Sequence, residues 1–257
     1  MRCPLCRCEQ GEGNQKCINC GVIFIKAAPP REPPCMGKPR STGFSLTKKG
    51  SAPQSQFDRV YDFLFPMEPA VNAFFFGGRV ILYLFLLVCG FIFILTPIEK
   101  SYTVMPFMHL INLPFHEAGH VIFSPVGRFI MFIGGTIGQL LIPGLCMGAF
   151  LIKARNPFGA SASLWWLAQN FIDIAPYIND ARSLELMLLG GVTGREVDGH
   201  DWENILHTLG LLQYDHVIAC ISHATGIVLM ITSLIWGGYI LYRQFKNVGE
   251  FGKPSAR

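Results

Sequence analysis

Three long stretches without a charged side chain constrain the fold of this chain more than any other feature. They cover residues 80–98, 129–152 and 217–242, and the only histidine within them is His223. A helix needs about 20 apolar residues to cross a bilayer, and each stretch is of that length or close to it. Only 15% of the chain is charged, whereas about a quarter of a typical soluble domain is. The sequence therefore predicts a mainly α-helical, multi-pass integral membrane protein in contact with the lipid bilayer.

Two further apolar segments, residues 105–123 and 161–181, extend the predicted membrane body. We expect about four to six transmembrane helices within residues 60–246, and an amphipathic helix over residues 201–212. Residues 134–139 are rich in glycine, which favours a partly non-helical conformation. Such backbone is tolerated at membrane depth only where it is buried in protein or lines a cavity.

Charge is distributed unevenly along the chain. Residues 1–60 hold ten Lys and Arg against four Asp and Glu, whereas the remainder holds eleven against thirteen. Basic segments favour the cytoplasmic side, so the N-terminal region is expected there. Arg243 and Lys246 favour the same side for the other end, but five full spans would separate the two ends. Either one segment is re-entrant, with residues 129–152 as the candidate, or one end departs from this bias.

The N-terminal region carries two pairs of cysteines in C-x-x-C spacing. Zn²⁺ in structural sites takes four tetrahedral ligands, and each such turn places two thiolates about one ion. A pair of disulfides is the alternative, but it suits secreted modules, and nothing in the sequence indicates secretion of this region. The pattern resembles a zinc ribbon over residues 1–26, with one Zn²⁺ held by Cys3, Cys6, Cys17 and Cys20.

Residues 27–59 have the Pro, Gly, Ser and Lys composition of a flexible linker, and residues 247–257 form a C-terminal tail. The ribbon lacks the basic stripe interleaved with aromatic residues that is typical of nucleic-acid binding. We therefore expect a cytosolic protein as its partner, or a purely structural role.

A second metal-binding pattern lies in the membrane body, where His116 and His120 flank Glu117 in an H-E-x-x-H sequence. Two histidines four residues apart share one face of a helix and can bind one ion, and the glutamate can take a proton from metal-bound water. The alternative is a pair of histidines that only pack helices together. Ionisable groups in an apolar helix are costly and usually functional, which favours the metal site.

A further ligand is expected from the polar stripe on residues 161–181. Asn170, Asp173, Tyr177 and Asp180 step by three and four residues, so they share one helical face. One acid can reach the metal while the other orients a histidine.

Together these motifs resemble the site-2 protease family of intramembrane zinc metalloproteases. The resemblance covers residues 104–182 and rests on His116-Glu117-Ala118-Gly119-His120, Gly134-Gly135, Asn170, Pro176 and Asp180. Two departures from the family pattern are a longer spacing between the asparagine and the proline, and Ala181 where glycine is usual.

The resemblance implies Zn²⁺ bound by His116, His120 and Asp180, with Asp173 as the reserve ligand. Glu117 would be the general base that activates zinc-bound water. The substrate would be a membrane-embedded protein or peptide, and residues 134–139 could pair with its unwound strand.

Other features remain beside this interpretation. The loop Asp198-Gly199-His200-Asp201-Trp202 is dense in side chains that can bind metals. Asp201 also precedes an expected helix, so it is read as the N-cap in preference to a ligand, and His200 is left unassigned. A di-iron desaturase is disfavoured, because the chain has seven histidines and none is adjacent to another. The alternative function is a non-catalytic membrane adaptor that carries the ribbon on a protease-like scaffold.

Overall fold

The computed structural model describes Glu9 and residues 55–66, 72–104 and 106–247. The chain divides into two units, Met1–Ser51 and Ala52–Arg257, and all helices described here belong to the second. The four ribbon cysteines, together with most of the linker and most of the C-terminal tail, lie outside the described residues. The described part is mainly helical and has no strand beyond one isolated antiparallel bridge between Met187 and Thr193.

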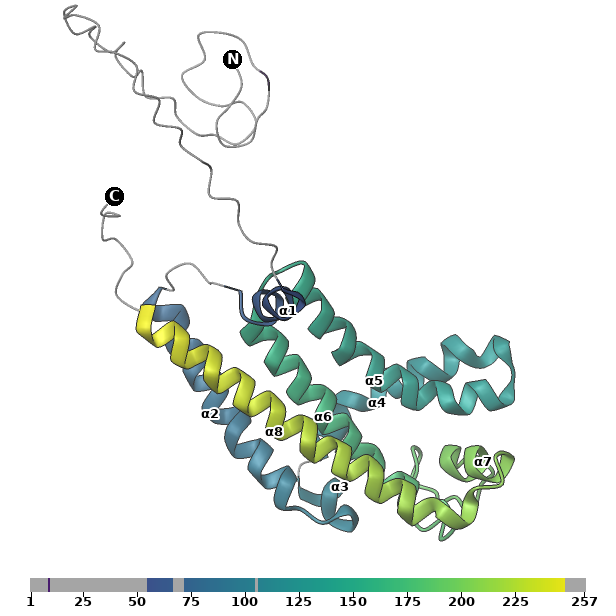
Figure 1. Ribbon diagram of the computed structural model, residues 1–257. Helices are drawn as coiled ribbons and strands as arrows, with labels where there is room; N and C mark the ends of the chain where they lie inside the picture. The colour runs from purple at the N-terminus through teal and green to yellow at the C-terminus, as the bar shows by residue number, and fades with distance from the viewer. Residues whose placement is uncertain (1–8, 10–54, 67–71, 105, 248–257) are drawn as a thin grey trace, which may run out of the picture. The chain divides into compact units, whose positions relative to one another are not determined.

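Eight α-helices account for most of the described chain (Figure 1). Three short 3₁₀ segments, η1–η3, lie beside them, at Ile98–Lys100, Ser124–Val126 and Leu212–Tyr214. In chain order the α-helices are α1 (Gln56–Leu64), α2 (Ala73–Leu95), α3 (Ser101–Val104), α4 (Pro106–Phe123), α5 (Arg128–Ile152), α6 (Pro157–Asn179), α7 (Asp201–Thr208) and α8 (Asp215–Asn247).

Three of these helical segments are long and apolar enough to cross a membrane: α2, α5 and Leu212–Asn247, which includes α8. They coincide with the three uncharged stretches of the sequence. The segments expected at 105–123 and 161–181 are also helical, as α4 and α6, but are not among these three. Helix α6 is too polar to be one of the three, because it carries polar side chains such as Gln169 and Asn170, which are buried in the bundle.

Helix α6 lies between α5 and α8, and most of its residues are buried (Figure 1). Its face toward α2 and α8 forms an apolar core around Phe93, Trp165, Ile172 and Met230. The indole of Trp165 also donates a hydrogen bond to the carbonyl oxygen of Leu86 in α2 (3.0 Å). The polar side chains Gln169 and Asp173 of α6 contact α4 instead, through Asn112 and His109.

Glycines bring α4 and α5 into backbone contact. A Cβ atom on Gly134 would lie 2.8 Å from the carbonyl oxygen of Gly119, and one on Gly135 would lie 2.6 Å from Nε2 of both His116 and His120. Small residues allow such close packing of membrane helices. The expectation that residues 134–139 are partly non-helical is therefore wrong: α5 is a continuous helix, and its glycines provide room for the face of α4 that carries the histidines.

The start of α2 and the end of α8 lie at the same end of the bundle, where the rings of Phe76 and Phe245 pack at 6.2 Å. The end of α6 and the start of α8 meet at the opposite end, where His216 Nδ1 lies 2.6 Å from Asn179 Oδ1. Helices α4 and α5 form an antiparallel hairpin. It begins near Asp173, in the second half of α6, and returns to the start of α6. Together, α4 and α5 therefore carry the chain from one end of the bundle to the other.

Candidate metal centre

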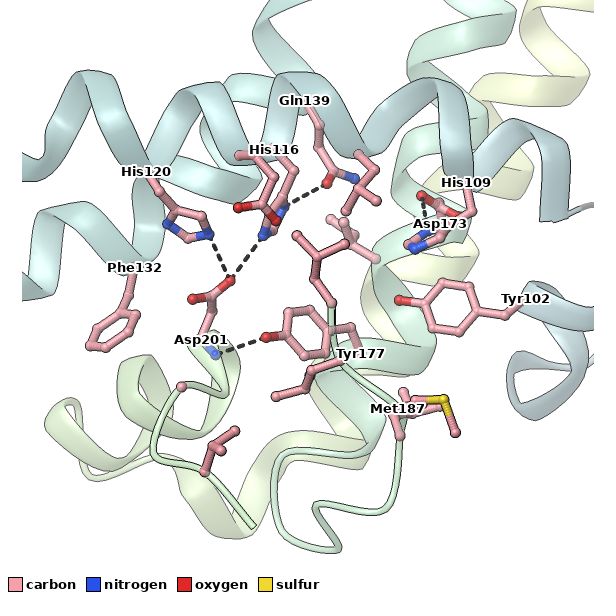
Figure 2. A pocket seen from close by; sticks show the side chains of 18 of the residues that line it. Tyr102, His109, His116, His120, Phe132, Gln139, Asp173, Tyr177, Met187 and Asp201 are labelled. Carbon is pink, nitrogen blue, oxygen red and sulfur yellow. Dashed lines mark hydrogen bonds and ion pairs between the residues drawn. The ribbon is translucent and has the colours of Figure 1, made fainter. Parts of the chain in front are cut away.

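Two histidines of α4 and one aspartate of α7 converge on a single point (Figure 2). Nε2 of His116 lies 2.9 Å from Oδ2 of Asp201, and Nε2 of His120 lies 3.1 Å from the same oxygen. The three potential ligand atoms lie within 4.8 Å of one another. His116 and Asp201 are buried, and His120 is half-buried. The predicted pairing of the two histidines is therefore present, and their acidic partner is Asp201.

Nδ1 of each histidine ring forms a hydrogen bond with an oxygen atom of α5. Nδ1 of His120 lies 2.8 Å from the carbonyl oxygen of Met131, and Nδ1 of His116 lies 2.8 Å from Oε1 of Gln139. Both partners belong to α5. Oxygen acceptors at Nδ1 fix each ring and direct Nε2 toward Asp201, and histidines that bind metals are commonly oriented in this way.

The start of α7 positions Asp201. His200 is the N-cap residue, and its Nδ1 accepts a hydrogen bond from the backbone N–H of Glu203 (3.1 Å). The hydroxyl of Tyr177 accepts one from the backbone N–H of Asp201 (2.9 Å). The expectation that Asp201 caps this helix is therefore wrong: His200 has that role, and the Asp201 side chain is free to reach the histidines.

Asp180, which the family resemblance indicated as the third ligand, lies outside this group. Its carboxylate accepts hydrogen bonds from the hydroxyl of Ser183 (2.6 Å) and from the backbone N–H groups of Glu185 and Leu186 (2.9 Å each). Oδ2 also lies 3.5 Å from Nε2 of His200. Asp180 therefore organises the chain that follows α6 and supports the residue next to Asp201.

Asp173, the reserve ligand, is also separate from the three. Its two carboxylate oxygens each lie 3.2 Å from Nδ1 of His109, and Oδ2 accepts a further hydrogen bond from the amide of Asn112 (3.0 Å). Asp173 thus pairs with another histidine of α4.

A cavity of about 930 Å³ opens beside these groups. Glu117 lines it with His116, His120 and Asp201, and its charge is close enough to act on His120 and Tyr177. Burial disfavours the charged form of the Asp201 carboxyl, but its hydrogen bonds to the two histidines outweigh this effect and lower its pKa. Burial also lowers the pKa of His200, which favours its neutral ring. The site therefore combines an anionic carboxylate with two oriented imidazoles and one further carboxyl group.

No protein-family model matches this chain, and no curated protein or solved structure matches it. The function proposed below therefore rests on the residues of the site.

Proposed function

We propose that this chain is a membrane-embedded zinc metallopeptidase in which His116, His120 and Asp201 hold the ion. The convergence of Nε2 of His116, Nε2 of His120 and a carboxylate oxygen of Asp201 carries this proposal, because the three potential ligand atoms lie within 4.8 Å of one another. A carbonyl oxygen can only accept, so the hydrogen bond to Met131 places a hydrogen on Nδ1 of His120 and leaves Nε2 as the ligand atom of the ring. A positive charge between the imidazoles and the carboxylate stabilises such a group. A proton on one ring would supply that charge, and a divalent cation would supply it while binding all three groups.

The donor set favours zinc over the common alternatives. Catalytic zinc sites have three protein ligands, typically histidine nitrogens and carboxylate oxygens, and keep one position open. Calcium and magnesium prefer oxygen ligands, so two imidazoles select against them. Bound zinc would act as a Lewis acid and bring the pKa of a water molecule to about 7.

Glu117 is the proposed general base. It follows His116 in α4 and lines the same cavity as the three ligands, so its carboxylate can accept a proton at the metal centre. The proposed reaction is hydrolysis of a peptide bond, and the motif around Glu117 supports membership of the site-2 protease class. Asp201, rather than Asp180, takes the place of the third ligand in this proposal.

The cavity walls support an apolar, membrane-embedded substrate. Beside the polar groups they include Leu113, Ile174 and the consecutive residues 186–189, Leu-Met-Leu-Leu. Such walls favour a peptide segment with apolar side chains, as in a transmembrane helix.

The charge at the two ends of the bundle supports an orientation. Residues 180–215, at the end that carries the metal centre, hold two Arg against seven Asp and Glu. The opposite end is basic, which favours the cytoplasm for it and for the proposed zinc ribbon, a candidate docking module for a cytosolic protein. Its basic residues are Arg79, Lys153, Arg155, Arg243 and Lys246.

Zinc content of the full-length protein, purified in detergent, tests the proposal. We expect two Zn²⁺ per chain, falling to one in His116→Ala and in Asp201→Ala, and also falling to one in Cys17→Ser as the ribbon control. Asp180→Asn, which keeps a side-chain oxygen to accept hydrogen bonds from the segment after α6, should keep both ions. Loss of zinc in Asp180→Asn but not in Asp201→Ala would contradict the ligand assignment.

The same preparations test catalysis. Glu117→Gln should keep its zinc and lose cleavage of a membrane substrate in cells. Full cleavage by this variant would remove Glu117 as the base. A membrane adaptor with a protease-like scaffold becomes the better account if the wild-type membrane site binds no zinc.

A further inference from the structure

The cavity has a second polar group beyond the metal centre. His109 of α4 and Asp173 of α6 line it together with His116 and Asp201, and the two histidines lie at separate positions along α4 (Figure 2). His109 precedes His116 by seven residues, which is two helical turns. At about 1.5 Å per residue the two positions are about 10 Å apart on the same face of α4.

A buried network holds this second group in place. Asp173 contacts His109 at 3.2 Å and accepts from Asn112 at 3.0 Å. The amide of Asn112 also donates to Oε1 of Gln169 (2.8 Å), and its oxygen accepts from the indole of Trp166 (2.9 Å). Asn112 and Gln169 are each 1% exposed. Buried polar networks of this kind fix side chains in a single position.

The exposure of the pair indicates which member is presented to the cavity. The Asp173 side chain is 7% exposed, whereas that of His109 is 36% exposed. Here the carboxylate is enclosed, and the imidazole that it orients faces the space shared with the metal centre.

We propose that His109 is a substrate-binding residue and that Asp173 is its positioning residue. The inference rests on the proposed peptidase function. His109 would hydrogen-bond a main-chain group of an extended peptide whose scissile bond lies at the metal centre. An extended chain rises about 3.3 Å per residue, so the 10 Å separation corresponds to about three residues. Leu113, which lies between the two positions on α4 and lines the cavity, would contact the apolar side chains in between.

A length series of metal-binding peptides tests the proposal. The probes are leucine hydroxamates with one to four residues, made in two series that extend from either side of the hydroxamate. Their dissociation constants are measured by calorimetry on the full-length protein in detergent. In the wild type, affinity in one series should rise about tenfold when the peptide reaches three residues, because the peptide then gains a hydrogen bond to His109.

Variants separate this role from a structural one. His109→Phe and Asp173→Ala should lose the tenfold gain and still bind the one-residue hydroxamate and zinc as the wild type does. His223→Phe, which replaces another membrane histidine outside the cavity lining, should keep the whole series unchanged. Equal length dependence in the wild type and in His109→Phe would overturn the inference while the metal centre stands. Failure of every probe to bind the wild type, with no zinc in the membrane site, would overturn the metal centre and the inference together.

Discussion

Replacement of Gly135 by alanine tests how closely α5 must approach the two histidines. A Cβ atom at this position would lie 2.6 Å from Nε2 of His116 and from Nε2 of His120. Ordinary contact begins at 3.4 Å, so the rings must retreat by about 0.8 Å. Zinc–nitrogen bonds are about 2.0–2.1 Å long with little tolerance, so this shift opens the site. We expect zinc affinity of the membrane site to fall at least tenfold, comparable to the loss of a residue that orients a ligand.

The assay is competition with a fluorescent zinc chelator, carried out on full-length protein in a Cys17→Ser, Cys20→Ser background so that only the membrane site is titrated. Gly148→Ala is the matched control, because it lies on the same helix and a Cβ there meets nothing within 4 Å. Alanine favours a helix over glycine by about 1 kcal/mol, so this control should bind zinc as the parent does and unfold at the same or a higher temperature. Unchanged zinc affinity in Gly135→Ala would refute the claim that the glycine makes room for the metal ligands.

Two further substitutions test the segment between α6 and α8. Arg182→Met should lower the unfolding temperature, because it removes the ion-pair partner at 2.7 Å from the buried Asp215 carboxylate and leaves it with the backbone N–H of His216. Arg195→Met, at an exposed ion pair, should change it little, and equal effects of the two variants would contradict this reasoning. Tyr177→Phe removes the acceptor for the backbone N–H of Asp201 and should weaken zinc binding about tenfold in the same chelator titration. Wild-type affinity would show that the hydroxyl does not position this ligand.

Local pattern was sufficient to predict the helices and two of the three members of the candidate metal centre. The three uncharged stretches correspond to α2, α5 and α8, because length and apolar character are properties of consecutive residues. His116 and His120 are one helical turn apart, so their spacing alone places them on one face. The mainly helical membrane architecture and the histidine pair were therefore predictable from sequence.

The third member of the centre was not predictable in this way. Asp201 is 85 positions from His116, and its approach depends on how the connection after α6 folds back on α4. Before a helix, an aspartate that caps and an aspartate that binds metal have the same local sequence. The signal that could have found it was the density of metal-binding side chains in Asp198-Gly199-His200-Asp201.

The glycine-rich residues 134–139 are the other place where the structure differs from the sequence-based prediction. In a sequence, clustered glycines are compatible with an open backbone or with close helix packing, and residues 134–139 were read as the first. Only the facing position, Gly119 of α4, distinguishes the two, because it shows a partner that also lacks a side chain. A short stretch of sequence does not show which residue of another helix faces a given glycine.

An ion held by α4 and α7 would also be a mechanical crosslink. His120 and Asp201 are separated by all of α5 and all of α6, so the ion would close a large loop that contains the core helix of the bundle. Closing such a loop removes conformational freedom from the unfolded chain and clamps the start of α7 against α4. Zinc supply would then set how much of the protein is correctly folded as well as how much is active. The Glu117→Gln variant would gain the full stability from bound zinc and would have no peptidase activity.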